Sequence, residues 1–376
     1  MATGIGNSAW WSNRRNRAAA QTTTGHYNQS QPQAKFTRSI LLVIGLCTLL
    51  IVSWRATVTY PTDVFDMYPV YFGAKALLQT GNAYATQAIV PSYHQEWDLY
   101  RTGNMYPLPA ILIAIPLSFL TPTLAAMVWV GLLMSGVLFA LRLSRLPIWW
   151  GFSMPILDGI RIEQYTILIV IFQIIALWAL RERKPWLLAL CCALILTKPN
   201  QGLFFVIVLV LLARNWRQQI VINGLIWGGS LLIDPNWPIE WLPTLEHYRA
   251  ITHQPILWGL ALFAIPLLLI RDWPAAATVL QFLVLPFPTA STYAVGAVPL
   301  TVLNDPRSKW LVPLSYGWVF PALIVGPAWA TASTILLPTV ILAVWRWYEQ
   351  NSGARAVRPV ALPAQPHDHA VAQIAE

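Results

Sequence analysis

The sequence predicts an all-α, polytopic membrane protein, a bundle of about 12 transmembrane helices. Of its 376 residues, 56% are hydrophobic and only 10% are charged, whereas a soluble domain carries roughly 25% charged residues. The apolar residues form continuous runs instead of alternating with polar ones, which favours helices over a β-barrel. The chain also contains 20 Trp and 13 Tyr, two residue types that are enriched at membrane interfaces.

The apolar runs that predict these helices follow one another closely along the chain. They lie at 39–59, 108–120, 122–143, 147–160, 164–181, 186–197, 201–214, 219–233, 255–270, 274–288, 290–303, 309–326 and 329–347. Several are shorter than the ~20 residues that a straight span needs, so we expect some helix ends to dip into a cavity. The run 108–120 either spans the membrane or enters it and returns to the same side. The count of about 12 transmembrane helices assumes that this run does not cross the membrane fully.

Basic residues between the runs set the expected orientation, because short cytoplasmic loops are enriched in Lys and Arg. The residues expected in the cytoplasm are Arg142, Arg145, Arg181, Arg183, Lys184, Arg214, Arg217, Arg271, Arg307, Lys309 and Arg346. The net charge of +9 is therefore interpreted as topology, and no nucleic-acid partner is expected. The expected location is the plasma (inner) membrane, with several passes and both termini in the cytoplasm.

The chain divides into a membrane domain and two tails. Residues 1–37 form a basic, polar cytoplasmic tail and residues 349–376 an Ala/Pro/Gln-rich one, and both are predicted to be disordered. The transmembrane domain covers residues 38–348, with long extracytoplasmic loops at 60–107 and 234–254. The first apolar run begins too far along the chain, and is too long, for the core of a signal peptide.

An acidic, aromatic segment follows the first predicted span. Asp63 and Asp66 precede an amphipathic stretch at residues 71–78, which predicts an interfacial helix in the first outer loop. In a chain with so few charges, ionisable groups near the membrane are candidates for function. On a helical turn the two aspartates share a face. The alternative is that Asp63 caps the start of the helix.

Other polar residues collect on the same predicted side of the membrane. They are Arg161, Glu163, Gln164, Lys198, Asn200, His247, Arg249 and His253. Each taken alone has a simpler interpretation, as an ordinary loop residue or as a Lys that extends to the interface. The spacing of the two histidines does not match a zinc-binding helix. No metal is therefore predicted, although a divalent cation at Asp63 and Asp66 is an alternative.

Several motifs follow one another along the chain. The first motif runs from Asp66 through Tyr71, Gly73 and Ala74 to Tyr84. Later ones are Tyr106-Pro107-Leu108-Pro109, Trp129, Glu163-Gln164-Tyr165, Thr197-Lys198-Pro199 and Asp234-Pro235-Asn236-Trp237. In this order they resemble glycosyltransferase family 87, whose members are multispan enzymes of the GT-C type and include polyprenol-phosphate-mannose-dependent mannosyltransferases. The resemblance spans roughly residues 40–350. Two positions depart from it. Glu163 stands where the family usually has Gly, and the second Pro of the family's Pro-Pro pair is displaced to Pro109.

The resemblance implies a GT-C-like bundle that transfers mannose, or another hexose or pentose, from a polyprenyl-phosphate donor to a lipid- or glycan-linked acceptor. Transfer would occur on the extracytoplasmic face with inversion, and it needs a general base, for which Asp66 is the first candidate and Asp63 the second. No cofactor is expected beyond the donor substrate. The candidates for holding the donor phosphate are Arg161, Lys198, His247, Arg249 and His253. The candidates for contacting the substrate are Tyr68, Tyr71, Glu163, Gln164 and Asn200.

Two other functions fit the same sequence. A transporter or flippase for a lipid-linked sugar would carry inverted repeats and broken helices near the midplane, and no convincing internal repeat is found. An inactive family-like scaffold would account for Glu163 and for the basic Arg161 beside it.

Overall fold

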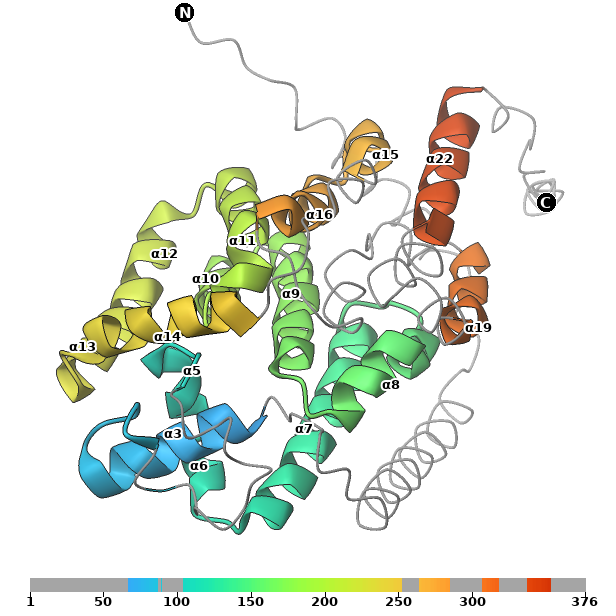
Figure 1. Ribbon diagram of the computed structural model, residues 1–376. Helices are drawn as coiled ribbons and strands as arrows, with labels where there is room; N and C mark the ends of the chain where they lie inside the picture. The colour runs from blue at the N-terminus through green and yellow to red at the C-terminus, as the bar shows by residue number, and fades with distance from the viewer. Residues whose placement is uncertain are drawn as a thin grey trace, which may run out of the picture. The chain divides into compact units, whose positions relative to one another are not determined.

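The computed structural model describes residues 67–86, 89, 104–251, 264–284, 306–317 and 337–352. In these residues all regular structure is helical and no strand occurs, which confirms the all-α prediction for this part of the chain. Figure 1 labels the helices: α3 (Met67–Thr80), α5 (Leu108–Ile113), α6 (Ile115–Ser118), α7 (Pro122–Leu143), η3 (Ile148–Phe152), α8 (Met154–Arg161), α9 (Tyr165–Arg181), α10 (Pro185–Ile195), α11 (Pro199–Ala213), α12 (Trp216–Asn223), η4 (Gly224–Gly228), α13 (Gly229–Ile233), α14 (Trp237–Ile251), α15 (Ala264–Leu269), α16 (Trp273–Val284), η6 (Pro306–Trp310), α19 (Leu311–Tyr316) and α22 (Leu337–Asn351).

Among the described residues, α7 alone is long and apolar enough to cross a membrane by length and composition. It begins where the sequence predicts a start. The Thr121 hydroxyl accepts a hydrogen bond from the Leu124 backbone N–H at 3.4 Å, and Pro122 occupies the first turn. Helices α9, α10 and α11 are apolar but shorter. A single such helix is weak evidence for a membrane protein, so the count of about 12 spans stays a prediction.

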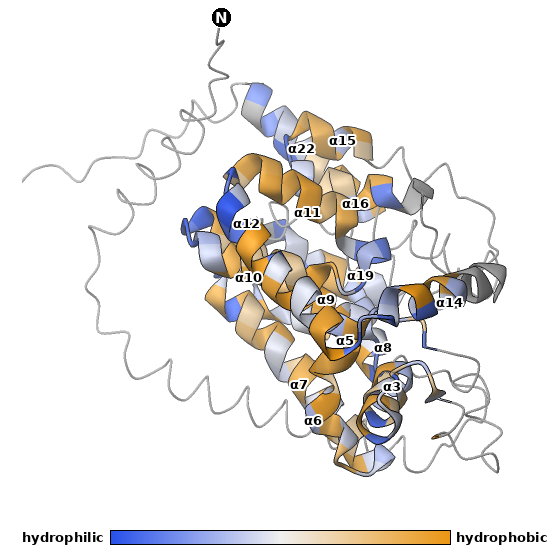
Figure 2. Ribbon diagram, turned by 90° about the vertical axis from the view of Figure 1, so that its left-hand side faces the viewer, coloured by the Kyte–Doolittle hydropathy of each residue, from blue (hydrophilic) through white to orange (hydrophobic). Residues whose placement is uncertain are grey.

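Helices α7, α9, α10 and α11 pack in sequence, α7 on α9, α9 on α10 and α10 on α11, and Figure 2 shows that they are predominantly hydrophobic. Two glycines allow close approach. A Cβ atom on Gly136 of α7 would lie 2.6 Å from the Ile171 side chain of α9, and one on Gly202 of α11 would collide with the Ile195 side chain of α10. The packing of these helices therefore depends on glycine at both positions.

Four of the helices end at an arginine in the left-handed conformation. Arg145, Arg183, Arg214 and Arg271 follow α7, α9, α11 and α15 with φ between 52° and 59°. This conformation stops a helix by turning the chain away from its axis. Because α9 and α11 run from residues 165 and 199 towards these arginines, Gln164 and Lys198 lie at the opposite ends of the same two helices.

Two predicted apolar runs are divided. The run 147–160 forms two helices, η3 and α8, which are separated at Ser153, where the backbone is extended (φ −69°, ψ 148°). The run 108–120 forms two short helices, α5 and α6, which meet at Ala114 two residues before Pro116. Residues 216–233 remain helical throughout, with the π-helical turn η4 in the middle.

The helix predicted in the first outer loop is present as α3. The predicted stretch 71–78 lies within it, and its first two turns are buried, where they pack against α5, α6 and α7. Asp63 and Asp66 precede this helix and lie outside the described residues, as do both predicted tails apart from residues 349–352.

Candidate active site

A short segment before α5 is fixed by a buried asparagine. The Asn104 amide nitrogen donates to the Pro69 carbonyl of α3 at 2.7 Å, and its side-chain oxygen accepts from the Tyr106 backbone N–H at 3.0 Å. A Cβ atom on Gly73 would collide with the Asn104 side chain. Gly73 therefore allows α3 to approach this segment, and Asn104 sets the position of Tyr106.

Lys198 joins three distant parts of the chain. Its ammonium donates to the Tyr106 hydroxyl at 3.0 Å and to the Thr166 hydroxyl at 3.2 Å, and it lies 5.3 Å from the centre of the Tyr106 ring. The Thr166 hydroxyl donates in turn to the Gln164 side-chain oxygen at 2.8 Å. Lys198 is only 9% exposed, so its ammonium is held inside the protein instead of extending to the interface. We call Tyr106, Gln164, Thr166 and Lys198 the lysine cluster.

Local sequence explains why Lys198 occupies this position. It is the N-cap residue of α11, and Pro199 follows at the first helical position, where its fixed φ suits a helix start. Pro199 also restricts the backbone of Lys198 to extended conformations, and Lys198 has φ −128° and ψ 74°. The ammonium group thereby comes to lie at the N-terminal ends of both α9 and α11.

An aromatic wall supports the lysine cluster. The Tyr165 ring lies 5.0 Å from Tyr106 and 5.9 Å from Trp129 between centroids, and the Tyr165 hydroxyl pairs with the Thr197 hydroxyl at 3.0 Å. Tyr106, Trp129 and Tyr165 are all buried. The rings exclude water from one side of the ammonium group, which strengthens its electrostatic interactions.

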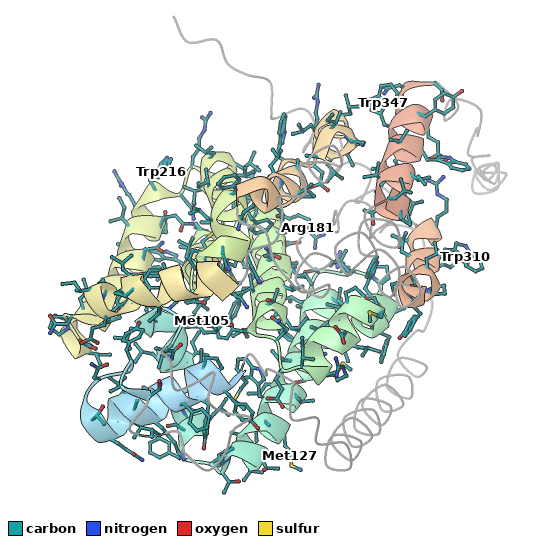
Figure 3. All side chains as sticks on the ribbon, viewed as in Figure 1. Met105, Met127, Arg181, Trp216, Trp310 and Trp347 are labelled. Atoms are coloured by element: carbon teal, nitrogen blue, oxygen red, sulfur yellow. The ribbon has the colours of Figure 1, made fainter. Side chains whose placement is uncertain are left out.

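Helix α14 attaches to the same segment from the other side. The Trp241 indole donates to the Met105 carbonyl at 3.0 Å, and the Thr244 hydroxyl donates to the Asn104 carbonyl at 3.0 Å; Figure 3 shows Met105 beside α14. The Tyr84 hydroxyl donates to the Tyr106 carbonyl at 3.1 Å. Tyr106 is therefore held through its backbone by residues from two further segments.

Two carboxylates lie at this junction. The Asn82 amide nitrogen donates to Glu240 at 3.0 Å, and the Asp234 carboxylate accepts from the Asn236 backbone N–H at 3.0 Å. Burial and the negative charge of Asp234 raise the pKa of Glu240, against the opposing effect of the Asn82 hydrogen bond. Burial of the Tyr84 side chain, together with the negative charges of Asp234 and Glu240, raises the pKa of Tyr84 well above its ordinary value. These shifts show that the groups interact electrostatically.

Comparison with known proteins gives one match, to a family model. Residues 104–239 match glycosyltransferase family 87. The matched region contains the whole lysine cluster and Asp234 of the junction, and it supports the family assignment. Glycosyltransferases of family 87 are membrane proteins. No curated protein and no solved structure matches the chain.

Glu163, where the resemblance predicts a glycine, lies in a tight turn after α8. Glu163 follows α8 with φ 56°, the left-handed conformation that glycine adopts at no steric cost. The Glu163 carbonyl accepts a hydrogen bond from the Trp129 indole at 3.1 Å, and its side chain is fully buried. The turn thus keeps the backbone conformation that suits a family glycine, and Glu163 adds a buried carboxyl group beside Gln164.

The structure places the other predicted site residues less closely together. Arg161 pairs with Asp158 within α8 at 3.1 Å. The Tyr71 hydroxyl donates to the Leu120 carbonyl at 2.8 Å, which favours a packing role, and Tyr68 is buried beside it. Asn200 is half-buried in the first turn of α11.

Three further candidates are not described at the level of side chains. His247 and Arg249 lie on α14, but their side chains are outside the described part, and His253 lies outside it altogether. The structure therefore neither adds them to the lysine cluster nor separates them from it. In the residues that the structure describes, no group of three or more His, Cys, Asp or Glu residues is arranged to hold a metal ion.

Sequence reasoning missed two members of the lysine cluster and one neighbour. Tyr106 stands out in the sequence only as part of a family motif and not as a site residue, and Thr166 does not stand out, because a hydroxyl in an apolar run carries no spacing signal. Gln201 was also missed. It begins the buried stripe of α11 three residues after Lys198, and its side-chain nitrogen and oxygen form no hydrogen bond with any described residue. A buried amide on an otherwise apolar helix face was the available signal.

Proposed function

We propose that the chain is a GT-C-type glycosyltransferase that moves mannose, or another hexose or pentose, from a polyprenyl-phosphate donor to a lipid- or glycan-linked acceptor. Transfer would take place on the extracytoplasmic face of the plasma (inner) membrane. The observation that supports this most directly is the buried ammonium of Lys198, held by the Tyr106 and Thr166 hydroxyls inside the region that matches the family.

The leaving group of this reaction is a polyprenyl phosphate, which gains negative charge as the bond to the sugar breaks. A cation fixed in advance stabilises that charge without reorganising during the reaction. Two neutral hydroxyls and the Tyr106 ring fix the ammonium of Lys198 in position. A phosphate oxygen beside it would accept a charge-assisted hydrogen bond, which is about twice as strong as a neutral one. We therefore assign Lys198 to the donor phosphate.

The general base is proposed to be Asp66, with Asp63 as the second candidate. Asp66 directly precedes α3, and the Pro69 carbonyl in the first turn of α3 accepts the Asn104 hydrogen bond that orients Tyr106. The base would take the proton of the acceptor hydroxyl while its oxygen attacks the anomeric carbon. The bond between that carbon and the phosphate oxygen breaks, its electrons remain on the phosphate, and the configuration inverts.

The remaining candidates complete the proposal with smaller roles. Gln164 would contact the sugar, since it is hydrogen-bonded to Thr166 within the lysine cluster. Glu163, Asn200 and Tyr68 are kept as substrate contacts, and Arg161, His247, Arg249 and His253 as further partners of the phosphate. No cofactor is required, and a divalent cation at Asp63 and Asp66 remains the alternative.

The assignment of Lys198 is tested by transfer from radiolabelled polyprenyl-phosphate sugars in membranes that contain equal amounts of each variant. Lys198→Met should lower transfer by about 10- to 100-fold, the value of a hydrogen bond to a charged group. Lys184→Met is a matched control, because Lys184 also precedes a helix-starting proline, Pro185, but is exposed. Equal transfer by wild type and Lys198→Met would refute the assignment.

A further inference from the structure

Four buried polar atoms around the start of α14 form no hydrogen bond with any residue that the structure describes. They are the indole N–H groups of Trp227 and Trp237, Oδ2 of Asp234 and Oε2 of Glu240. Asp234 and Trp237 are each more than nine-tenths buried. We call these four residues the α14 corner. Burying a polar group without a partner is costly, so four such groups in one place require an explanation.

The four side chains lie close together. Ring centroids are 6.0 Å apart between Trp227 and Trp237, and 5.8 Å apart between Trp237 and Trp241. Trp237 and Glu240 are three residues apart on α14, and so share a face of that helix. Burial and, to a lesser extent, the negative charge of Asp234 raise the pKa of Glu240.

The chemistry of the α14 corner indicates which ligand would satisfy it. A metal cation would satisfy the two carboxylate oxygens but none of the indole N–H groups. A phosphate would accept from the indoles but be repelled by the carboxylates. A hydroxyl group donates and accepts at once, and a sugar carries several hydroxyls around a ring whose apolar face suits contact with an aromatic ring.

We propose that the α14 corner is a binding subsite for a neutral saccharide, in which Asp234 and Glu240 accept from sugar hydroxyls and Trp227 and Trp237 donate to them. The inference rests on the proposed function and deepens it, since the saccharide is the glycan part of the acceptor. Trp227 and Glu240 are partly exposed, so the corner reaches the protein surface. Binding would require these side chains to move apart, because their polar atoms are shielded from solvent.

Hydrogen bonds connect the α14 corner to the lysine cluster. Glu240 accepts from Asn82, the Asn82 side-chain oxygen accepts from the Tyr84 backbone N–H at 2.7 Å, and the Tyr84 hydroxyl donates to the Tyr106 carbonyl. Tyr106 in turn accepts from Lys198. An acceptor held at the corner would therefore lie on the α14 side of the segment that positions the proposed donor site.

Direct binding tests this proposal without requiring transfer. Saturation-transfer NMR would be recorded on the purified full-length chain with methyl glycosides of mannose, glucose and arabinose. The wild type should give a signal with at least one glycoside, and Trp237→Phe, which keeps a ring but removes the N–H, should reduce it about fivefold or more. Asp234→Asn should do the same. Trp216→Phe is the control, because Trp216 is exposed on α12.

Three outcomes would overturn the saccharide subsite. Equal signals from wild type and Trp237→Phe would show that the corner does not bind the glycoside. Calcium that raises the melting temperature of the wild type but not of Asp234→Asn, with no glycoside signal, would identify a cation site. If no protein gives a glycoside signal and calcium leaves the melting temperature unchanged, the corner holds only bound water. Failure of sugar transfer alongside an Asp234-dependent signal would reject the proposed function but keep the subsite.

Discussion

Removal of the Tyr106 hydroxyl tests whether the lysine cluster acts on the donor. Tyr106→Phe keeps the ring, and with it the contact with Tyr165 and the ring face near Lys198. It also keeps the backbone hydrogen bonds of residue 106. The variant loses the hydroxyl that accepts from the Lys198 ammonium at 3.0 Å.

The size of the effect follows from the positive charge of the Lys198 ammonium, which donates this hydrogen bond. A hydrogen bond to a charged group contributes about 1.5–3 kcal/mol, which corresponds to about 10- to 150-fold. Thr166 still accepts from Lys198 at 3.2 Å, so we expect the lower end, about a tenfold loss. The loss should appear in kcat/KM for the polyprenyl-phosphate donor and leave KM for the acceptor unchanged.

Steady-state transfer assays with varied donor would measure this loss, with Tyr84→Phe as the matched control. The Tyr84 hydroxyl bonds to the carbonyl of residue 106 but not to Lys198, so its removal should change kcat/KM for the donor by less than about threefold. Thr166→Val should resemble Tyr106→Phe, and Thr166→Ser should restore activity because it restores the hydroxyl. A wild-type kcat/KM for Tyr106→Phe, or equal losses in Tyr106→Phe and Tyr84→Phe, would refute the reasoning.

Three further predictions concern stability, measured as thermal melting in detergent. Glu163→Gly should stabilise the protein by about 1 kcal/mol, because glycine adopts the φ of 56° without strain; a lower melting temperature would show that the buried Glu163 side chain outweighs the strain. Gly202→Ala should destabilise by about 1–3 kcal/mol, because its Cβ would collide with Ile195, and an unchanged melting temperature would mean that α10 and α11 separate easily. Since the pKa of Glu240 is raised above its ordinary 4.5, the folded state binds more protons than the unfolded chain above that pH. Stability should therefore fall as the pH rises from the ordinary pKa through the raised one. Glu240→Gln should flatten this profile, and an identical slope in both proteins would exclude Glu240 as its source.

The central helices could be predicted because particular residue types mark where they begin and end in the sequence. The runs 122–143, 164–181, 186–197 and 201–214 correspond to α7, α9, α10 and α11 within two residues at each end. Proline at the start and arginine just past the end limit most of them. The run 147–160 could not be predicted as two elements from hydropathy alone, because the extended backbone at Ser153 changes no hydrophobicity.

The lysine cluster could be predicted only in part. Lys198 and Gln164 stood out as polar residues at the ends of apolar runs, and the structure brings them into one cluster. Their partner Tyr106 is 92 residues from Lys198 in sequence, and such a pairing depends on how α3, α9 and α11 pack. The role of Asp66 as base stays a prediction, because that residue lies outside the described part of the chain.

The central claim is that the chain cleaves a lipid-linked sugar donor instead of moving it intact. The most direct test is to reconstitute the protein in vesicles with a polyprenyl-phosphate sugar labelled in the sugar, and to add a glycolipid acceptor extracted from membranes. The account predicts that polyprenyl phosphate and labelled acceptor form in equal amounts, and that Asp66→Asn abolishes both products at an unchanged protein level. Labelled donor that crosses the bilayer intact, with no polyprenyl phosphate released, would contradict it and identify a flippase.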